Sequence, residues 1–94
     1  MHGEYKVPDG KLVVIDLDVD HHRLRHVELS GDFFLLPEDA IWRMMAALEG
    51  APADATEEEL SGRVRAAAQG AELVGITPEG VAVAVRRALA GETA

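Results

Sequence analysis

Residues 11–19 read KLVVIDLDV, and this stretch decides the fold. Apolar side chains recur there at every second position, namely Val13, Ile15, Leu17 and Val19. A period of two is typical of a strand with one buried face. Residues 23–29 resume the alternation after a short polar break at Asp20-His21-His22. The sequence therefore predicts an antiparallel β-hairpin.

The segment after the hairpin contains a glycine and two adjacent aromatic residues. Ser30-Gly31-Asp32 interrupts the alternation before Phe33 and Phe34. A glycine within a strand pattern indicates a bulge or a place where another backbone comes close. Neighbouring residues of an extended segment point to opposite faces. We expect one ring in the core and the other against solvent or a partner, unless a helix covers both faces.

The first helix is predicted from an apolar stripe that follows Pro37. Pro37 suits the first turn of a helix, and Gly50 suits its end. The stripe has the spacing i, i+3, i+4, i+7 of a core-facing helix and consists of Ile41, Met44, Met45 and Leu48. Trp42 lies at the edge of this stripe, where it either caps the core or anchors a partner.

Two further helices are predicted from their N-terminal caps. Thr56 and Glu59 form a capping-box pattern ahead of residues 60–68. Thr77 and Pro78 supply a cap and a first-turn proline for a helix that runs to about Leu89. Residues 72–76 form a short extended stretch between these helices. The predicted fold class is α+β, a two-layer domain in which an antiparallel hairpin of two to three strands packs against about three helices.

Length and charge limit the possible partners. The 94 residues fit one domain, residues 1–94. The net charge is −8, and residues 31–60 alone hold eight acidic residues and one arginine, or 1 − 8 = −7. Phosphate backbones and anionic lipids would repel this segment, so neither nucleic acid nor a membrane surface is expected as the partner.

Composition also excludes several kinds of chemistry. The chain has no cysteine, which rules out disulfides, thiolate metal sites and cysteine nucleophiles. No apolar run approaches the length of a membrane helix, and the first residues lack a signal-peptide pattern, so the expected location is cytoplasmic. No glycine-rich phosphate loop and no nucleophile elbow are present, so no catalytic residue is assigned.

One cluster has the residue types of a metal site. Histidine and carboxylate side chains can bind zinc or a similar ion. The turn of a hairpin directs such side chains outward and apart, so we expect a solvated turn and no metal site. The residues concerned are Asp18, Asp20, His21, His22 and His26.

Four segments resemble, in the same order along the chain, the accessory domain of lipoate–protein ligases. Residues 5–13 read YKVPDGKLV, residues 29–35 LSGDFFL, residues 37–41 PEDAI and residues 72–79 ELVGITPE. The first segment is similar to the K-x-P-G-G-K-L opening of that family, and the second to its S/T-G-D-F-F run. Asp9 stands where the family usually has glycine, which leaves the detail of that turn open.

The resemblance implies an accessory role in a ligase reaction. In that family a catalytic domain binds lipoate and ATP with Mg²⁺, forms lipoyl-adenylate, and transfers the lipoyl group to a lysine of an acceptor protein. The accessory domain is implied to be needed for the adenylation step. Accordingly, we expect this chain to bind no cofactor alone and to be non-catalytic alone. Its expected partners are a catalytic ligase chain and, indirectly, lipoyl-acceptor domains.

The same resemblance implies which residues face the partner or its active site. Lys6 and Lys11 flank the first motif's turn, where one approaches the partner's active site or pins the turn, with pinning favoured for Lys6. Gly31 permits close backbone approach, Asp32 fixes the bulge or a partner loop, and one phenylalanine anchors the contact. The full set is Lys6, Gly10, Lys11, Gly31, Asp32, Phe33 and Phe34.

An alternative function remains open. An acidic, free-standing interaction module, paired as a homodimer through an exposed strand edge and a spare aromatic ring, fits the same composition. Residues 90–94 have a composition that could begin a linker to another domain.

Overall fold

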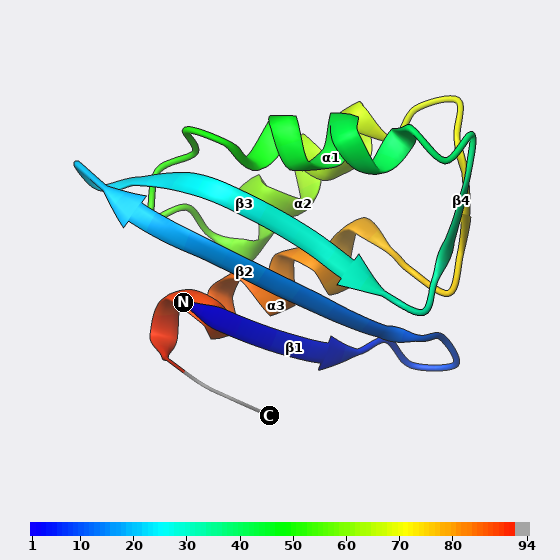
Figure 1. Cartoon of the computed structure of the whole chain (residues 1–94), viewed down its shortest axis with the longest axis horizontal. Coiled ribbons are helices and arrows are strands. Elements are labelled where there is room, and N and C mark those ends of the chain that lie inside the picture. The colour runs from blue at the N-terminus through cyan, green and yellow to red at the C-terminus, as the bar shows by residue number, and fades with distance from the viewer. Residues whose placement is uncertain (92–94) are drawn as a thin grey trace.

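The computed structural model describes residues 1–91 and has the predicted hairpin as its longest feature (Figure 1). The two strands are β2 (Leu12–Asp20) and β3 (Arg23–Gly31), which pair in antiparallel fashion. Val13, Ile15 and Leu17 are all buried, as their alternation predicts. The hairpin prediction is confirmed.

A third strand extends this sheet. β1 (His2–Lys6) pairs antiparallel with β2, so the strand order is β1-β2-β3. Our sequence interpretation did not include this strand. The signal was present, because polar His2, Glu4 and Lys6 alternate with Gly3 and Tyr5.

The hairpin turn consists of two histidines in an unusual conformation. His21 and His22 have φ angles of 52° and 64°. Two successive positive φ angles define a type I′ turn, which matches the twist of the strands it joins. The bulge of this hairpin lies at His26, with φ 53°, where the register shifts between Asp16 and Asp18 of β2.

The bulge is therefore not at Gly31. The sequence predicted either a bulge or a close approach of another backbone at this glycine, and the close approach is confirmed. Gly31 has φ 150°, and a Cβ atom there would lie 2.1 Å from the carbonyl oxygen of Leu12. No side chain fits at this distance. Histidine is a weak sequence signal for a bulge, which is why the glycine drew the prediction instead.

Three helices follow, as predicted. They are α1 (Ala40–Leu48), α2 (Glu57–Ala67) and α3 (Pro78–Ala90). The hydroxyl oxygens of Thr56 and Thr77 accept backbone N–H groups at the starts of α2 and α3, at 3.1 and 2.9 Å. α1 begins at Ala40, three residues after Pro37, because a tight turn closed by the Ala40 N–H on the Pro37 carbonyl precedes the helix.

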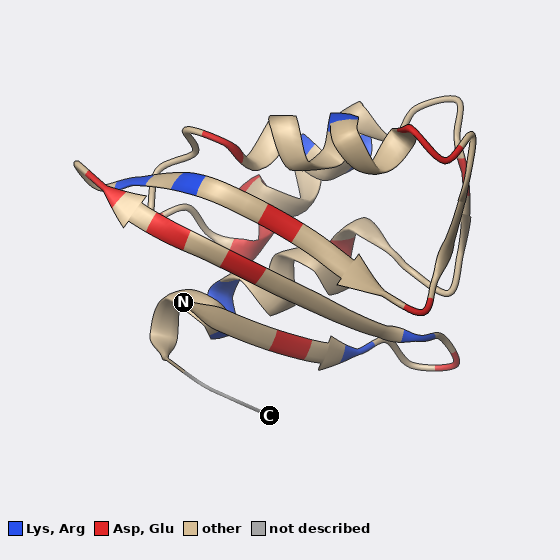
Figure 2. Ribbon diagram, in the orientation of Figure 1, with Lys and Arg blue, Asp and Glu red and all other residues tan. Residues whose placement is uncertain are grey.

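The helices cover one face of the sheet, which gives the two-layer α+β architecture that the sequence predicts (Figure 1). The core between the layers consists of aliphatic side chains and one methionine. Its largest fully buried members are Ile15, Leu24, Met44, Leu48, Leu60, Val13, Val64, Val81 and Val85. Among residues 1–91, no helix lies on the opposite face of the sheet, and acidic residues of β1, β2 and β3 lie along that face (Figure 2).

A separate two-stranded ribbon lies at one end of the molecule. It pairs β4 (Phe34–Leu36) with β5 (Glu72–Val74) in antiparallel fashion. The extended stretch predicted for residues 72–76 is thus a strand in its first part. The ribbon extends beside the sheet and leads through β5 into α3 (Figure 1).

The C-terminal end of the described chain is a helix end. α3 stops at Ala90, and Gly91 adopts a left-handed conformation with φ 76°. The linker predicted for residues 90–94 falls mostly on residues 92–94, which lie outside the described residues. Within residues 1–91, no helix is both long and apolar enough to cross a membrane.

Candidate functional site at the motif end

Segments far apart in the sequence meet at one end of the molecule. The backbone N–H of Lys11, in the turn region between β1 and β2, donates to the carbonyl of Gly75 at 2.8 Å. Gly31 lies against Leu12 in the same region. Along the chain, Gly31 precedes β4 and Gly75 follows β5, so the β4–β5 ribbon starts from this region (Figure 1). We call this region the motif end and define it as residues 6–11, 31–36 and 72–80.

Glycines make this convergence possible. A Cβ atom on Gly10 would lie 2.8 Å from the Gly75 carbonyl oxygen. Gly75 has φ 82°, and a Cβ there would lie 2.6 Å from Cγ of Lys11. Contacts this short exclude any side chain, so Gly10 and Gly75 are required for the three segments to pack. Their role in the fold is therefore established by contacts within this chain.

The turn between β1 and β2 accommodates the aspartate that departs from the family pattern. Asp9 has φ 57°, a left-handed conformation that glycine adopts most easily. Aspartate is among the few other residues that tolerate it. The turn is closed by the Gly10 N–H on the Val7 carbonyl at 2.8 Å. Aspartate at position 9, in place of the family's usual glycine, thus preserves the turn.

The two lysines differ in their surroundings. Both are exposed. The Lys6 ammonium donates to the Val7 carbonyl at 3.3 Å, which agrees with a role in pinning the turn. Within the part of the chain that the structure describes, the Lys11 ammonium has no acceptor, although its aliphatic stem packs against Gly75. Of the two ammonium groups, that of Lys11 is thus the one without a hydrogen-bond partner among the described residues.

The two phenylalanines differ in burial. Phe33 is half-buried against the core, and its ring lies beside Gly31. Phe34 is 67% exposed. The predicted split between the two rings is confirmed, and the ring left for a partner is that of Phe34. Asp32, which precedes them, is exposed. The partner-facing roles assigned to these residues stay predictions.

The sequence interpretation missed two apolar residues of the motif end. Leu36 is 54% exposed and Val74 is 43% exposed. Both belong to the ribbon, and Val74 is the cross-strand partner of Phe34. A strand pairing between residues 34–36 and 72–74 cannot be read from either segment alone, so this group had no signal in the sequence.

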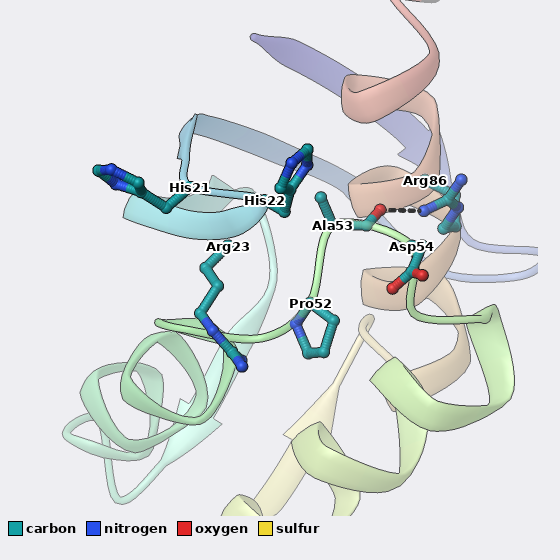
Figure 3. Close-up of a pocket in the computed structure, with 7 residues that line it drawn as sticks. All are labelled: His21, His22, Arg23, Pro52, Ala53, Asp54 and Arg86. Carbon is teal, nitrogen blue, oxygen red and sulfur yellow. Dashed lines mark hydrogen bonds between the residues drawn. The ribbon is translucent and has the colours of Figure 1, made fainter.

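The opposite end of the hairpin contains an open hollow of about 450 Å³. We call it the tip end and define it as residues 20–23, 50–55 and Arg86 (Figure 3). Arg86 donates to the carbonyls of Ala53 and Ala55 at 2.8 and 3.3 Å, and Arg23 donates to Gly50 at 2.9 Å. His21 points away from the other lining residues in Figure 3.

The histidines of the predicted metal-like cluster do not converge. His21 contacts Asp20 and His26 contacts Asp18, both at 3.0 Å, as two separate pairs. Across residues 1–91, no three metal-ligating side chains are placed to hold one ion. The pairs are strongly exposed, as expected for a solvated turn.

A third histidine forms a network on the uncovered face of the sheet. The His2 ring lies 2.7 Å from the carboxylates of both Glu4 and Asp16. The hydrogen bonds to Glu4 and then to Asp16 raise the pKa of His2 above its ordinary value. The network joins β1 to β2, which pair at His2 and Asp16.

The fold and the motif end define a small two-layer α+β domain in which three of the four segments of the family resemblance meet at one end. No family model matches the chain. "Lipoate-protein ligase A subunit 2" of Thermoplasma acidophilum is 44% identical over 39 residues, which are 42% of this chain and 42% of that protein. The alignment thus spans less than half of that relative, and the equal shares mean that the two chains are about equally long.

A solved structure extends the likeness over almost the whole chain. It describes an archaeal lipoylation system from Thermoplasma acidophilum, a bi-partite lipoate protein ligase and its E2 lipoyl domain. One of its chains matches with a TM-score of 0.75 and 31% identity, over 92% of this chain and 93% of that one. This chain belongs to the family of small accessory subunits of lipoate–protein ligases.

Proposed function

We propose that this chain is the accessory subunit of a two-chain lipoate–protein ligase. It acts with a separate catalytic chain that activates lipoate to lipoyl-adenylate with ATP, before transfer to a lysine of an acceptor protein. The observation that supports this most is the likeness over 92% of the chain to one chain of a bi-partite ligase. The convergence of the resemblance segments at the motif end supports it further.

The ligands of the reaction belong to the catalytic chain in this proposal. ATP with Mg²⁺ needs several cations or backbone N–H groups that converge on its phosphates, with oxygen ligands for the metal. At the motif end, the described residues offer the exposed ammonium groups of Lys6 and Lys11 and the exposed carboxylates of Asp9 and Asp32. This set does not fit a nucleotide site of its own. The motif end is instead a surface that completes or orders a site on the partner.

The charges of the motif end then have distinct roles. Adenylation brings a carboxylate and a polyphosphate together, so a correctly placed cation lowers the barrier. Lys11 supplies that cation at the edge of the partner's active site, and its stem is held by Gly75. Lys6 keeps the turn in place through the Val7 carbonyl. Asp32 contacts a loop of the partner, and Phe34 anchors the two chains.

The rival function, a homodimer built on an exposed strand edge, has a specific obstacle. β1 lies at one edge of the sheet, and β3 lies at the other. The guanidinium of Arg87 donates to the Glu4 carbonyl of β1 at 3.0 Å and lies 5.0 Å from the centre of the Tyr5 ring. One carbonyl along this strand is thus already bonded, which disfavours the addition of another strand.

The test is lipoate-dependent exchange of pyrophosphate into ATP by the catalytic ligase chain from the same source. We expect exchange with both chains present and little with either alone. Replacing Asp32 with alanine should weaken complex formation or exchange. A catalytic chain that exchanges at full rate alone contradicts the proposed function, and a tight homodimer by mass measurement then favours the rival.

A further inference from the structure

The outward face of the β4–β5 ribbon is an apolar surface that the described chain leaves uncovered. Phe34 and Val74 are directly paired across the ribbon, so their side chains share a face, and Leu36 shares it because it lies two residues beyond Phe34. These side chains are 67%, 43% and 54% exposed, respectively. On the other face, Leu35 is buried in the core. The ribbon therefore has two apolar faces, of which its own chain covers one.

Acidic residues surround this outward face. Glu72 pairs with Leu36 across the ribbon and so shares the face. Glu38 lines a hollow together with Phe34. Asp32 precedes the ribbon in sequence, and Figure 2 shows acidic positions at both ends of β4. We call Phe34, Leu36 and Val74 the ribbon face, and Asp32, Glu38 and Glu72 its rim.

We propose that the ribbon face is where the catalytic ligase chain docks, through an apolar pocket that lysine and arginine side chains surround. The proposal rests on the proposed function and specifies its contact surface. An exposed aromatic at the centre of an apolar patch is the usual anchor of an interface, and the charged residues around it select the partner and speed the encounter. The acidic rim requires a basic surround on the partner.

A second copy of this chain does not fit the ribbon face. Two copies that met here would bring the rims together, acid against acid, at a cost to association. The apolar area is also small: aromatic side chains bury about 150–250 Å² each. Three side chains therefore provide a few hundred Å², against about 800 Å² per partner in a standard interface. A stable interface must therefore also include the acidic rim, and only a positively charged partner surface can bind there favourably.

Trp42 provides a matched control. Its side chain is 67% exposed, the same fraction as that of Phe34, but it lies on α1 outside the ribbon. It does not line the hollow beside Phe34, whereas its neighbour Ile41 does. If exposed aromatics in general promoted association, Trp42 and Phe34 would matter equally. If the ribbon face is the dock, only Phe34 matters.

The experiment measures pyrophosphate exchange by the catalytic chain while the concentration of this chain is varied. In the double variant Phe34→Ser/Leu36→Ser we expect the half-saturating concentration to rise about 100-fold, with most of the maximal rate kept at saturation. Trp42→Ser should change it less than threefold. Since all three side chains are more than half exposed, the variants should keep the far-UV circular dichroism of the parent.

A charge variant tests the rim without removing apolar groups. Glu38→Lys/Glu72→Lys should raise the half-saturating concentration about tenfold at low salt and reduce its salt dependence. If exchange requires the wild-type chain but neither double variant changes the half-saturating concentration, the docking proposal is wrong and the proposed function still holds. Equal losses from Trp42→Ser and Phe34→Ser/Leu36→Ser also overturn it. A wild-type chain that gives no exchange overturns both.

Discussion

The two ends of the β2–β3 hairpin are built in different ways. At the motif end, chain segments touch backbone to backbone, and Gly31 and Gly75 adopt left-handed conformations where no side chain fits. At the tip end, the arginine side chains of Arg23 and Arg86 bond the carbonyls of the linker between α1 and α2. The tip end thus satisfies its own polar groups, whereas the motif end exposes Phe34 and Lys11. This difference is the reason why we propose partner contact at the motif end.

Substitution of close-approach glycines should produce the largest effect. Gly31→Ala adds a Cβ that meets the Leu12 carbonyl at 2.1 Å. We expect the free energy of unfolding to fall by about 3 kcal/mol, from strain and overpacking together. Urea denaturation followed by circular dichroism measures this.

Gly50→Ala is the matched control at the tip end. Gly50 also has a positive φ, 77°, but its Cβ would meet Arg25 only at an ordinary contact distance of 3.5 Å. The backbone conformation alone should cost about 1 kcal/mol. Equal losses at the two glycines would mean that the motif end is not packed more tightly than the tip end.

Removal of Arg86 should destabilise the fold but leave the partner contact intact. In Arg86→Met the carbonyls of Ala53 and Ala55 lose a charged donor, at a cost of about 2 kcal/mol in the free energy of unfolding. The half-saturating concentration in the exchange assay should stay within twofold of the wild type at a temperature where the variant is folded. A large rise would place the tip end in the interface and reverse our assignment.

The two lysines allow a test within the motif end. Lys11→Met keeps the aliphatic stem against Gly75 and removes the charge, so we expect about a tenfold lower exchange rate at saturation, equivalent to 1.4 kcal/mol. Lys6→Met loses a single bond to the Val7 carbonyl and should lower the rate less than twofold. The reverse order would show that Lys6 is the cation that reaches the active site.

The smallest effect is expected on the uncovered face of the sheet, which belongs to neither end. The pKa of His2 is raised by Glu4 and Asp16, so its protonation stabilises the folded state at low pH. This contribution is complete below about pH 6.5, the pKa of the unfolded chain's histidine, and is lost as the pH rises through the folded pKa.

The His2→Gln variant measures that contribution. The difference in urea midpoint between wild type and variant should be larger at pH 5.5 than at pH 9. The charged ring donates to both Glu4 and Asp16, whereas the neutral ring has one N–H and can donate to only one of them. If the difference in urea midpoint is the same at the two pH values, the contribution of the His2 contacts with Glu4 and Asp16 does not depend on the charge of His2.

Those features that depend on local patterns could be predicted from the sequence. The start of α3 follows from Thr77 and Pro78, because a cap and a first-turn proline act within a few residues. The different burial of Phe33 and Phe34 follows from the period of an extended chain. The first residue of α1 could not be predicted, because Pro37 permits a helix but does not require one to begin there.

Features that depend on pairing between distant segments could not be predicted. The ribbon face forms only because residues 34–36 pair with residues 72–74, and neither segment specifies the other. The bulge lies at His26, where a histidine adopts a conformation more typical of glycine. The contact of Lys11 with Gly75 likewise joins segments more than sixty residues apart in sequence. The family resemblance supplied Lys6, Gly10, Lys11 and residues 31–34 of the motif end, but not Leu36, Val74 or the arrangement of the segments.

The most direct test of the central claim is a titration of the exchange reaction. A fixed amount of the catalytic chain is mixed with increasing amounts of this chain at concentrations far above the half-saturating value. We predict that the rate of lipoate-dependent exchange rises linearly from near zero and levels off at one copy of this chain per catalytic chain. A rate that is already full without this chain, or that never depends on its amount, would contradict the accessory role.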